Sequence, residues 1–304
     1  MEIELSIIIC TYNREDYLPL TLESLATQSL DKNRFEVIIV DNNSTDKTSS
    51  YCHTFIEHHP GMIVKYILEK NRGLPFARNR GIKESSGSYI AFIDDDAEAR
   101  KDYAANLIRV FEKYTEYEAV GGKVIPVFPE NKEPPWLSSY IWGVVAKVDK
   151  GDQYSSFKRK VPAGCNMAFR KKVFSIIGDF DTDLSHRCDD LYIFGKLKAI
   201  NKVALYSPDV VVYHNIPPER MDKEGIKKLS MNLGASHRIF LRNKPFYSRV
   251  IKFLDYVFKI CAAIVLSIGF LLKAEPTKTK IVVIMWYSLV GFLRVKSSEI
   301  PVSV

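Results

Sequence analysis

The sequence lacks the glycine-rich loops that mark the commonest nucleotide-binding folds. The segment after the first predicted strand, Thr11-Tyr12-Asn13-Arg14, contains no glycine, so the G-x-G-x-x-G fingerprint of dehydrogenases is absent. The P-loop pattern G-x-x-x-x-G-K-[ST] is also missing, as is the Gly-rich, arginine-bearing first loop expected of a sugar nucleotidyltransferase. These absences argue against a dehydrogenase, a P-loop NTPase and a nucleotidyltransferase.

Paired cysteines and an export signal are lacking too. None of the five cysteines belongs to a C-x-x-C pair, and an odd number argues against a complete set of internal disulfides. We therefore expect a reducing compartment. The segment from Met1 to Glu4 is acidic and leads directly into a strand-like run, without the basic and then apolar layout of a signal peptide. We expect no signal peptide and no export by that route.

The positive charge is concentrated near the end of the chain. The 304 residues carry a formal net charge of +7 and are 46% hydrophobic, which suits one large domain with an appendage. Residues 217–304 hold 15 Lys and Arg against 6 Asp and Glu, whereas residues 1–216 hold 28 against 30. The sequence between these basic residues is apolar and helix-like, which favours anionic lipid over nucleic acid. We predict a membrane surface, and no nucleic acid, as a partner.

Short apolar runs alternate with helix-like segments in the first hundred residues. Residues 5–10, 35–40, 63–68 and 89–93 are predicted strands, and residues 89–93 have the length and the branched or aromatic composition of a strand buried on both faces. Residues 17–28 place apolar side chains three to four positions apart, as an amphipathic helix does. Strand and helix repeat in the βαβ pattern, so we predict a Rossmann-like α/β fold with a mostly parallel central sheet flanked by helices.

Three consecutive aspartates, Asp94-Asp95-Asp96, directly follow the fourth of these runs. This position is the C-terminal edge of a parallel sheet, where open α/β folds bind their ligands. Adjacent carboxylates repel one another unless a cation lies among them, and Mg²⁺ or Mn²⁺ binds such oxygen ligands when substrate phosphates complete the shell. We predict a site for a divalent metal and a diphosphate. The alternative is a solvated acidic turn that ends the strand.

Five motifs in register resemble glycosyltransferase family 2. They occupy residues 6–14, 40–46, 71–73, 77–79 and 93–96, and the resemblance extends over roughly the first 215 residues. It implies the GT-A fold and the transfer of a sugar from a nucleotide-sugar donor with inversion at the anomeric carbon. It also implies a divalent metal, Mn²⁺ or Mg²⁺, as cofactor.

Four residues match the family's contacts to the nucleotide. Thr11, Asn13 and Arg14 match the loop after the first strand, which borders the nucleotide, and Asp41 matches the acidic residue that contacts the base or the ribose. A carboxylate can accept hydrogen bonds from ribose hydroxyls or from a base imino group, in agreement with that role. The polar residues 44–46 have a second interpretation, because they are also good N-cap residues for the next helix.

Five further residues match the part of the family's site that binds the diphosphate and the metal. Arg78 and Asn79 match the donor-side loop, where an arginine can give charge-assisted hydrogen bonds to a diphosphate. Asp94 and Asp96 match the ends of the D-x-D motif, which bridges the metal to the diphosphate, and Asp95 between them is assigned to donor binding. We expect Asp96 to be the direct metal ligand.

An acidic pair and a histidine complete the predicted site. Asp189 and Asp190 match the family's Glu-Asp pair, with Asp in the first place, and by position Asp190 is the general base for the attacking hydroxyl. The alternative is that the pair caps the helix predicted over residues 191–199. His214 follows two predicted strands, residues 203–206 and 210–213, and the family's histidine at such a position ligates metal or contacts phosphate. A structural histidine is the alternative.

Pro217-Pro218 marks a predicted domain boundary. Before it, a loop rich in proline and aromatic residues, 126–142, could stack on a sugar or pack on its own domain. The predicted parts are residues 1–98 as the nucleotide-binding half and 99–217 as the acceptor-binding half of a catalytic domain, 1–217, followed by a basic, apolar helical tail, 218–304.

The tail contains two apolar runs, residues 260–272 and 281–293, of 13 residues each. Both are shorter than the roughly 20 residues that cross a bilayer, so we predict two interfacial or re-entrant helices whose flanking Lys and Arg meet anionic headgroups. The alternative is a pair of soluble core helices. Little other sequence remains for these runs to pack against, which favours the membrane.

These features predict an inverting enzyme that moves a single sugar from a UDP- or GDP-sugar to a hydroxyl of a glycan or lipid-linked acceptor, in cell-surface polysaccharide synthesis. The family's processive synthases carry long membrane spans and a Q-x-x-R-W motif, which this sequence lacks. We expect the protein at the cytoplasmic face of the inner membrane, peripheral or re-entrant. Two alternatives are a catalytically silent scaffold that binds nucleotide or glycan, and a membrane-embedded partner protein with an acidic ion site.

Overall fold

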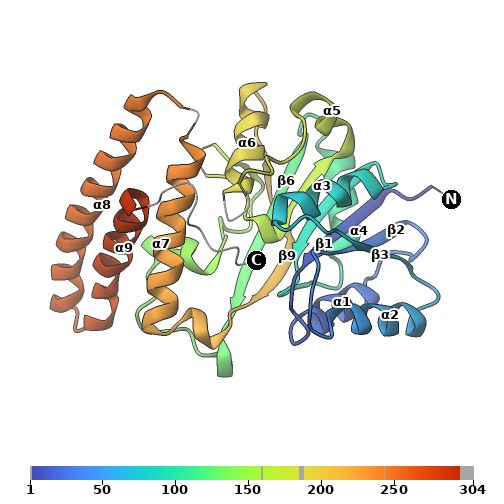
Figure 1. Cartoon of the computed structure of the whole chain (residues 1–304), viewed down its shortest axis with the longest axis horizontal. Coiled ribbons are helices and arrows are strands. Elements are labelled where there is room, and N and C mark those ends of the chain that lie inside the picture. Colours follow the sequence, from blue (N-terminus) through green and yellow to red (C-terminus); the bar gives the residue numbers. More distant parts are fainter. Residues whose placement is uncertain (1, 159, 185–187, 243, 295–304) are drawn as a thin grey trace.

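A mixed sheet forms the centre of the molecule, and helices cover both of its faces (Figure 1). The computed structural model describes residues 2–158, 160–184, 188–242 and 244–294. The strands are β1 (Leu5–Thr11), β2 (Phe35–Asp41), β3 (Ile63–Leu68), β4 (Tyr89–Asp94), β5 (Ala97–Ala99), β6 (Ala119–Val127), β7 (Ser155–Ser156), β8 (Met167–Arg170) and β9 (Leu205–Asn215). The helices are α1 (Leu18–Ala26), α2 (Thr48–His58), α3 (Leu74–Glu84), α4 (Tyr103–Lys113), α5 (Phe174–Ile177), α6 (Asp189–Ala199), α7 (Lys223–Phe240), α8 (Phe246–Leu272) and α9 (Lys280–Arg294).

The sheet has a parallel half and a mixed half. Its order is β3-β2-β1-β4-β8-β6-β9-β5, with β7 paired to β9. Strands β1 to β4 are parallel because a helix returns the chain between each pair, as the alternation of apolar runs predicts. Beyond them, β8 runs antiparallel to β4 and β6, and β5 and β7 run antiparallel to β9. The predicted central sheet flanked by helices is confirmed.

The last strand differs from the prediction of two short strands, residues 203–206 and 210–213. The structure has one strand, β9, of 11 residues. Its pairing with β6 shifts register between Gly122 and Lys123, where the partner changes from Ser207 to Val211. Pro208 lies in this bulge, where a residue without an amide hydrogen interrupts no ladder hydrogen bond. The proline therefore bends the strand without ending it.

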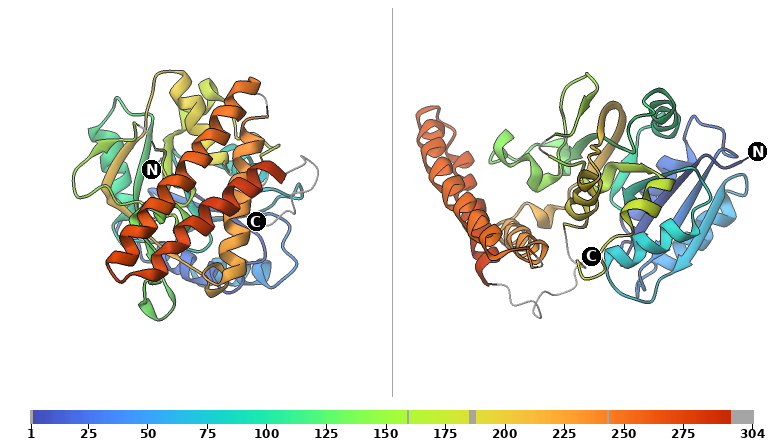
Figure 2. Two further views of the ribbon diagram at one scale, coloured as in Figure 1. Left: turned by 90° about the vertical axis from the view of Figure 1, so that its left-hand side faces the viewer. Right: turned by 90° about the horizontal axis from the view of Figure 1, so that it is seen from above.

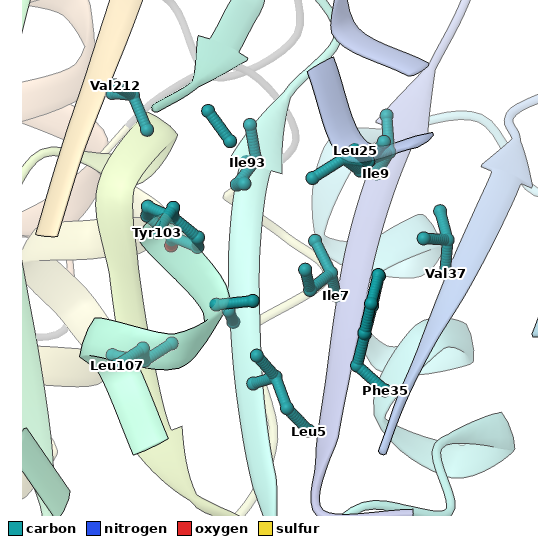
Figure 3. Packing of buried hydrophobic residues seen from close by; sticks show 14 of the residues in the cluster. Leu5, Ile7, Ile9, Leu25, Phe35, Val37, Ile93, Tyr103, Leu107 and Val212 are labelled. Atoms are coloured by element: carbon teal, nitrogen blue, oxygen red, sulfur yellow. The ribbon is translucent and has the colours of Figure 1, made fainter. Parts of the chain in front are cut away.

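Strand β1 is buried on both faces, because its side chains alternate between two helix layers. Leu5, Ile7 and Ile9 point into the core beneath α1, α2 and α4 (Figure 3). Ile8 and Cys10 point into the opposite core, beneath α3, α5 and α6. The continuous apolar run thus fixes β1 in the centre of the sheet, and the polar residues that follow it emerge at the sheet edge.

The three C-terminal helices form a separate layer at the end of the molecule farthest from the N-terminus (Figures 1 and 2). Helix α9 packs on α7 with close backbone contact, since a Cβ atom on Gly234 would lie 1.9 Å from the carbonyl oxygen of Ser288. Likewise, a Cβ atom on Gly291 would lie 2.0 Å from the carbonyl oxygen of Met231. Two glycines, one on each helix, therefore let the α7 and α9 backbones touch.

The tail corrects two expectations about its apolar runs. The first run is only the second half of α8, a helix of 27 residues that is long and apolar enough to cross a membrane. The second run lies in α9 and has partners to pack against, because Ile281 and Ile284 are buried in a cluster with Trp136 and Ile141. The Pro-aromatic loop therefore packs on the tail, and the division of the chain after residue 217 stays a prediction.

The glycine contact between α7 and α9 gives a test of this packing. We expect Gly234→Ala to lower the free energy of unfolding by about 1–3 kcal/mol, because the added methyl group meets backbone atoms of α9. Gly269→Ala in α8 is the matched control. Nothing lies within 4 Å of its added Cβ, so helix propensity alone should stabilise the protein by up to about 1 kcal/mol. Thermal unfolding in detergent measures both, and equal shifts would contradict the packing.

Candidate functional site

The predicted site residues gather where β1, β2 and β4 end and where α6 begins. Parallel sheets bind ligands at this edge because their loops and helix N-termini meet there. Asp94 ends β4 and Asp41 ends β2, while Arg14 lies in the loop after β1. His214, near the end of β9, is brought in because Ala97, next to the aspartates, pairs with it.

Asp96 is the most heavily engaged carboxylate of the three. His214 Nε2 lies 3.2 Å from its Oδ1, and an Arg220 guanidinium nitrogen lies 3.3 Å from its Oδ2. Arg14 approaches the same Oδ2 at 3.8 Å. Burial alone would raise the pKa of Asp96, but the hydrogen bond with His214 and the charges of Arg220 and Arg14 lower it to about 2. Asp96 is therefore ionised at any physiological pH.

Asp95 has the opposite character. Burial, and then the charge of neighbouring Asp96, raise its pKa to about 7. Arg14 lies 3.6 Å from its Oδ1, and its Oδ2 is buried without a hydrogen-bond partner within the part of the chain that the structure describes. Its main-chain oxygen accepts a hydrogen bond from Thr21, which anchors the turn to α1. Near neutral pH this carboxylate needs a proton or a further cation to balance its charge.

Arg78 joins the aspartate cluster to α6. Its guanidinium is buried and pairs with the Asp189 carboxylate, with Asp94 Oδ1 at 3.4 Å and with the Gly164 carbonyl oxygen at 3.4 Å. The rings of Phe92 and Phe180 lie over its central carbon at 5.6 and 5.4 Å. One cation thus connects residues from the sheet edge, the turn before β8 and the start of α6.

Asp190 lies in the first turn of α6, next to Asp189. Burial, and then the charge of Asp189, raise the pKa of Asp190 to about 6. Its Oδ1 accepts a hydrogen bond from the Leu191 amide at 2.7 Å, so the alternative role in satisfying the helix N-terminus is also present. A carboxylate with this pKa can take up a proton near neutral pH and release it again.

Three of the predicted donor-binding residues make contacts inside the protein. Asn79 exchanges two hydrogen bonds, each 2.9 Å, with the backbone of Phe180. Asp41 is buried and accepts hydrogen bonds from the Tyr66 hydroxyl and the Ser44 amide. Arg78 is committed to Asp94 and Asp189, as described above. Their direct contact with a donor stays a prediction.

Asn13 and Thr11, the other two predicted residues at the end of β1, differ in exposure. Asn13 joins the loops after β1 and β2, because its Oδ1 accepts a hydrogen bond from the Thr45 amide and its own amide donates to Ser44. Its φ angle of 52° is left-handed, a conformation that asparagine tolerates better than most residues. Thr11 is fully buried at the end of β1, and its main-chain oxygen accepts a hydrogen bond from the Asn42 amide.

The sequence reasoning missed two residues that shape the site. Asn42 holds the loop before α3, since its side chain donates to the Asn71 carbonyl and accepts from the Gly73 amide. It lies beside Asp41 in a polar cluster and could have been noticed there. Arg220 contacts Asp96 across 124 residues of chain. No sequence motif around Arg220, which follows Pro217-Pro218 closely, predicts this contact.

The donor set fits a divalent metal that also binds a phosphate group. Asp96 and His214 already lie together, and Asp94 belongs to the same turn. Within residues 2–294, apart from the undescribed positions, no three His, Cys, Asp or Glu side chains form a ready-made metal cage. Mg²⁺-type ions are commonly held by one or two carboxylates plus substrate phosphates, so a complete cage is not required.

Comparisons of sequence agree with this chemistry. The family model described as glycosyl transferase family 2 matches residues 6–178, more than half of the chain. The glucosyl-dolichyl phosphate glucuronosyltransferase of Haloferax volcanii is 28% identical over 188 residues, which cover 61% of this chain and 58% of that protein. The next two curated relatives are matched over 16% and 14% of their length. The chain thus spans less than two thirds of each of these relatives.

Two solved structures share the fold. The mannosyltransferase PcManGT from Pyrobaculum calidifontis, in complex with GDP-Man and Mn²⁺, has a TM-score of 0.67, covers 97% of this chain and 88% of its own, and is 19% identical. S. aureus TarS 1-349, in complex with UDP-GlcNAc, has a TM-score of 0.55, covers 80% and 68%, and is 18% identical. At these identities the likeness concerns the fold, and the predicted GT-A fold is confirmed.

The buried position of Arg78 gives a prediction about stability. We expect Arg78→Met to lower the free energy of unfolding by about 3 kcal/mol or more, because it leaves the buried Asp189 carboxylate without its cation. Arg80→Met, on the same helix, is the control. Arg80 pairs with Glu84 at the surface, so its loss should cost no more than about 0.5 kcal/mol. Denaturant unfolding of both variants checks this, and similar losses would contradict the bridging role of Arg78.

Proposed function

Because the chain belongs to glycosyl transferase family 2, we propose that it is an inverting enzyme that transfers one sugar from a UDP- or GDP-sugar to a hydroxyl of a glycan or lipid-linked acceptor. The observation that supports this most is the bridge of Arg78, which joins Asp94 to Asp189 beside Asp190. Direct displacement needs a base for the incoming hydroxyl and a site for the leaving diphosphate in fixed relation. The buried guanidinium of Arg78 would hold the proposed base and the proposed diphosphate site at a fixed distance from each other.

Asp190 is the general base in this proposal. Inversion by direct displacement requires that the attacking hydroxyl lose its proton as the new glycosidic bond forms, and an ionised carboxylate can accept it. The pKa of Asp190, raised to about 6, makes it a stronger base than an ordinary aspartate and still leaves it ionised at neutral pH. Asp189, held by Arg78, keeps the first turn of α6 and therefore Asp190 in place.

The leaving nucleoside diphosphate binds at the Asp94 end of the contact that Arg78 makes between Asp189 and Asp94. Asp96, His214 and Asp94 would hold Mn²⁺ or Mg²⁺ there, and the ion would supply positive charge to the departing diphosphate. Arg14 lies beside the same aspartates and can add charge-assisted hydrogen bonds to phosphate oxygens. The aspartates bind the cation and the arginine orients the anion, so neither needs to take part in proton transfer.

The loops after β1 and β2 are the proposed nucleotide contacts. Asn13 ties these loops together, and Thr11 and Asp41 support them from inside the fold. PcManGT is described with GDP-Man and Mn²⁺, and TarS with UDP-GlcNAc, which supports a metal-dependent UDP- or GDP-sugar donor for this chain. The relative from Haloferax volcanii is named for a lipid-linked substrate, glucosyl-dolichyl phosphate, which supports a lipid-linked acceptor.

Helix α8 is the proposed contact with the cytoplasmic face of the membrane. Its inner side packs on the rest of the tail through Tyr256, Ala263 and Ser267. Its outer side is an apolar stripe whose members are three or four residues apart, except for one step of seven between Phe258 and Val265. Its basic ends suit anionic headgroups. Because one side is already packed, we propose that α8 lies along the membrane. The stripe, each member more than half exposed, consists of Tyr247, Ile251, Leu254, Phe258, Val265, Ile268 and Leu272.

The role of Asp190 predicts a pH dependence. Protonated Asp190 cannot accept the hydroxyl proton, so kcat/KM should fall about tenfold per pH unit below about 6 and level off above it. Asp190→Asn should lower kcat by about 10²–10⁴ while nucleotide binding is retained. Initial rates of donor consumption, measured from about pH 4.5 to about pH 8, report both effects. Unimpaired transfer by Asp190→Asn would exclude this residue as the base.

Nucleotide binding tests the donor class and the metal together. Thermal unfolding with UDP, GDP and their sugars, each with and without Mn²⁺, should show a metal-dependent rise for one base. Asp96→Asn should abolish the rise, because it removes the carboxylate that His214 and Arg220 contact. A rise without any sugar transfer would favour the silent scaffold. No rise with any nucleotide would contradict the enzyme proposal.

Vesicle flotation tests the membrane face. The double variant Phe258→Glu, Val265→Glu places two charges on the apolar stripe, so it should no longer float with anionic vesicles that carry the wild type. Ile176→Glu, an exposed apolar residue of α5 outside the tail, is the control and should float normally. Neutral vesicles should bind the wild type more weakly. Flotation of the double variant at the wild-type level would rule out α8 as the contact.

A further inference from the structure

Arg220 lies between the catalytic sheet and the tail, in the short 3-10 turn Pro218–Arg220 that connects β9 to α7. Its guanidinium donates a hydrogen bond to Asp96 Oδ2, 3.3 Å away. Asp96 is almost fully buried, with 3% of its side chain exposed, whereas 31% of the Arg220 side chain is exposed. The carboxylate is therefore fixed, and the arginine reaches it from the solvent side.

Both oxygens of Asp96 are already in use. His214 faces Oδ1, and Arg220 and Arg14 share Oδ2. A divalent ion held by Asp96 and His214 would lie beside Oδ1, close enough to repel the guanidinium at Oδ2 of the same carboxylate. The proposed metal and Arg220 thus compete for the negative charge of one carboxylate. Binding of the ion weakens the contact of Asp96 with its arginines.

Arg220 is better placed to leave than Arg14. Arg14 also faces Asp95, stacks against Tyr17 and is tied through its amide to Thr48. The contact with Asp96 is the one hydrogen bond that the Arg220 side chain makes to the described residues. Rotation of the Arg220 side chain breaks a single hydrogen bond, whereas rotation of the Arg14 side chain would also break its contacts with Asp95 and Tyr17.

The backbone around Arg220 is held from both sides. The Asn215 amide donates to the main-chain oxygen of Asp96, and the Ile216 amide donates to Val127. On the other side, the Glu219 carbonyl is packed so closely against α7 that a Cβ atom on Gly225 would lie 1.8 Å from it. Side-chain rotation therefore suffices for the exchange, and the guanidinium stays within reach of whatever binds next to Asp96.

We propose that Arg220 is a positioning residue that neutralises Asp96 in the donor-free protein and passes to the diphosphate when the metal and nucleotide arrive. This inference rests on the proposed function. A guanidinium prefers paired phosphate oxygens to a carboxylate shared with a metal ion, because it can form two parallel charge-assisted hydrogen bonds to them. The exchange keeps the local charge balanced in both states and makes tight metal binding depend on the nucleotide.

The test compares Mn²⁺ binding by the full chain and by Arg220→Ala, measured in detergent by electron paramagnetic resonance of free Mn²⁺. With Mn²⁺ alone, Arg220→Ala should bind about five- to tenfold more tightly than wild type, because the competing cation is gone. With Mn²⁺ and UDP or GDP present, the variant should bind the nucleotide about five- to tenfold more weakly. Arg220→Lys should give intermediate values in both arms.

Lys227→Ala is the matched control. It removes one positive charge from the same region, but Lys227 pairs with Glu224 on the surface of α7, so both affinities should stay at the wild-type level. Mn²⁺ affinity that is unchanged or weakened in Arg220→Ala, or undetectable in all variants, would overturn the proposal. The measurement with Mn²⁺ alone contains no nucleotide, so it can support the role of Arg220 even if neither UDP nor GDP binds. Failure of the Arg220 proposal is thereby distinguished from failure of the proposed donor class.

Discussion

Arg78 is a guanidinium ion enclosed by two aromatic rings and two carboxylates, and its position decides where both halves of the site lie. A buried charge of this kind persists only when it is paired and hydrogen-bonded. Asp94, from the end of β4, and Asp189, from the start of α6, supply that pairing. The aspartate turn and the proposed base are therefore tied to one internal charge, although 95 residues of chain separate Asp94 and Asp189. The same contact makes the first turn of α6 part of the sheet edge.

The three adjacent aspartates differ because each meets different neighbours. Asp94 faces Arg78, Asp95 is buried with one oxygen unpaired, and Asp96 faces His214 and Arg220. These surroundings move the pKa of Asp95 up to about 7 and that of Asp96 down to about 2. Arginines of the protein itself balance these carboxylates, so the proposed metal ion would have to compete with them. The charges that balance the three aspartates come from Arg14 in the loop after β1, from Arg78 in α3 and from Arg220 in the link to the tail.

Much of the fold could be predicted from the sequence, because continuous apolar runs such as residues 5–10 and 35–40 leave few alternatives to buried strands. The placement of the aspartates and His214 at one edge of the sheet could be predicted as well, since polar residues that end such strands meet there. The contacts between Arg78 and Asp189 and between Asp96 and Arg220 could not, because they arise only when distant segments are folded together. Local pattern also failed for α9, which buries one face, including Ile281 and Ile284, against α7 and the Pro-aromatic loop and is not exposed on all sides.

The dependence of the site on Arg78 is tested most directly by a double-mutant cycle between Asp94→Asn and Asp189→Asn, measured as free energy of unfolding. Either single change leaves the other carboxylate to pair with Arg78, whereas the double change leaves a buried guanidinium without either partner. We expect the double variant to lose about 1–3 kcal/mol more than the sum of the single losses. Additive losses, within about 0.5 kcal/mol, would show that the two carboxylates do not share one cation and would contradict this view of the site.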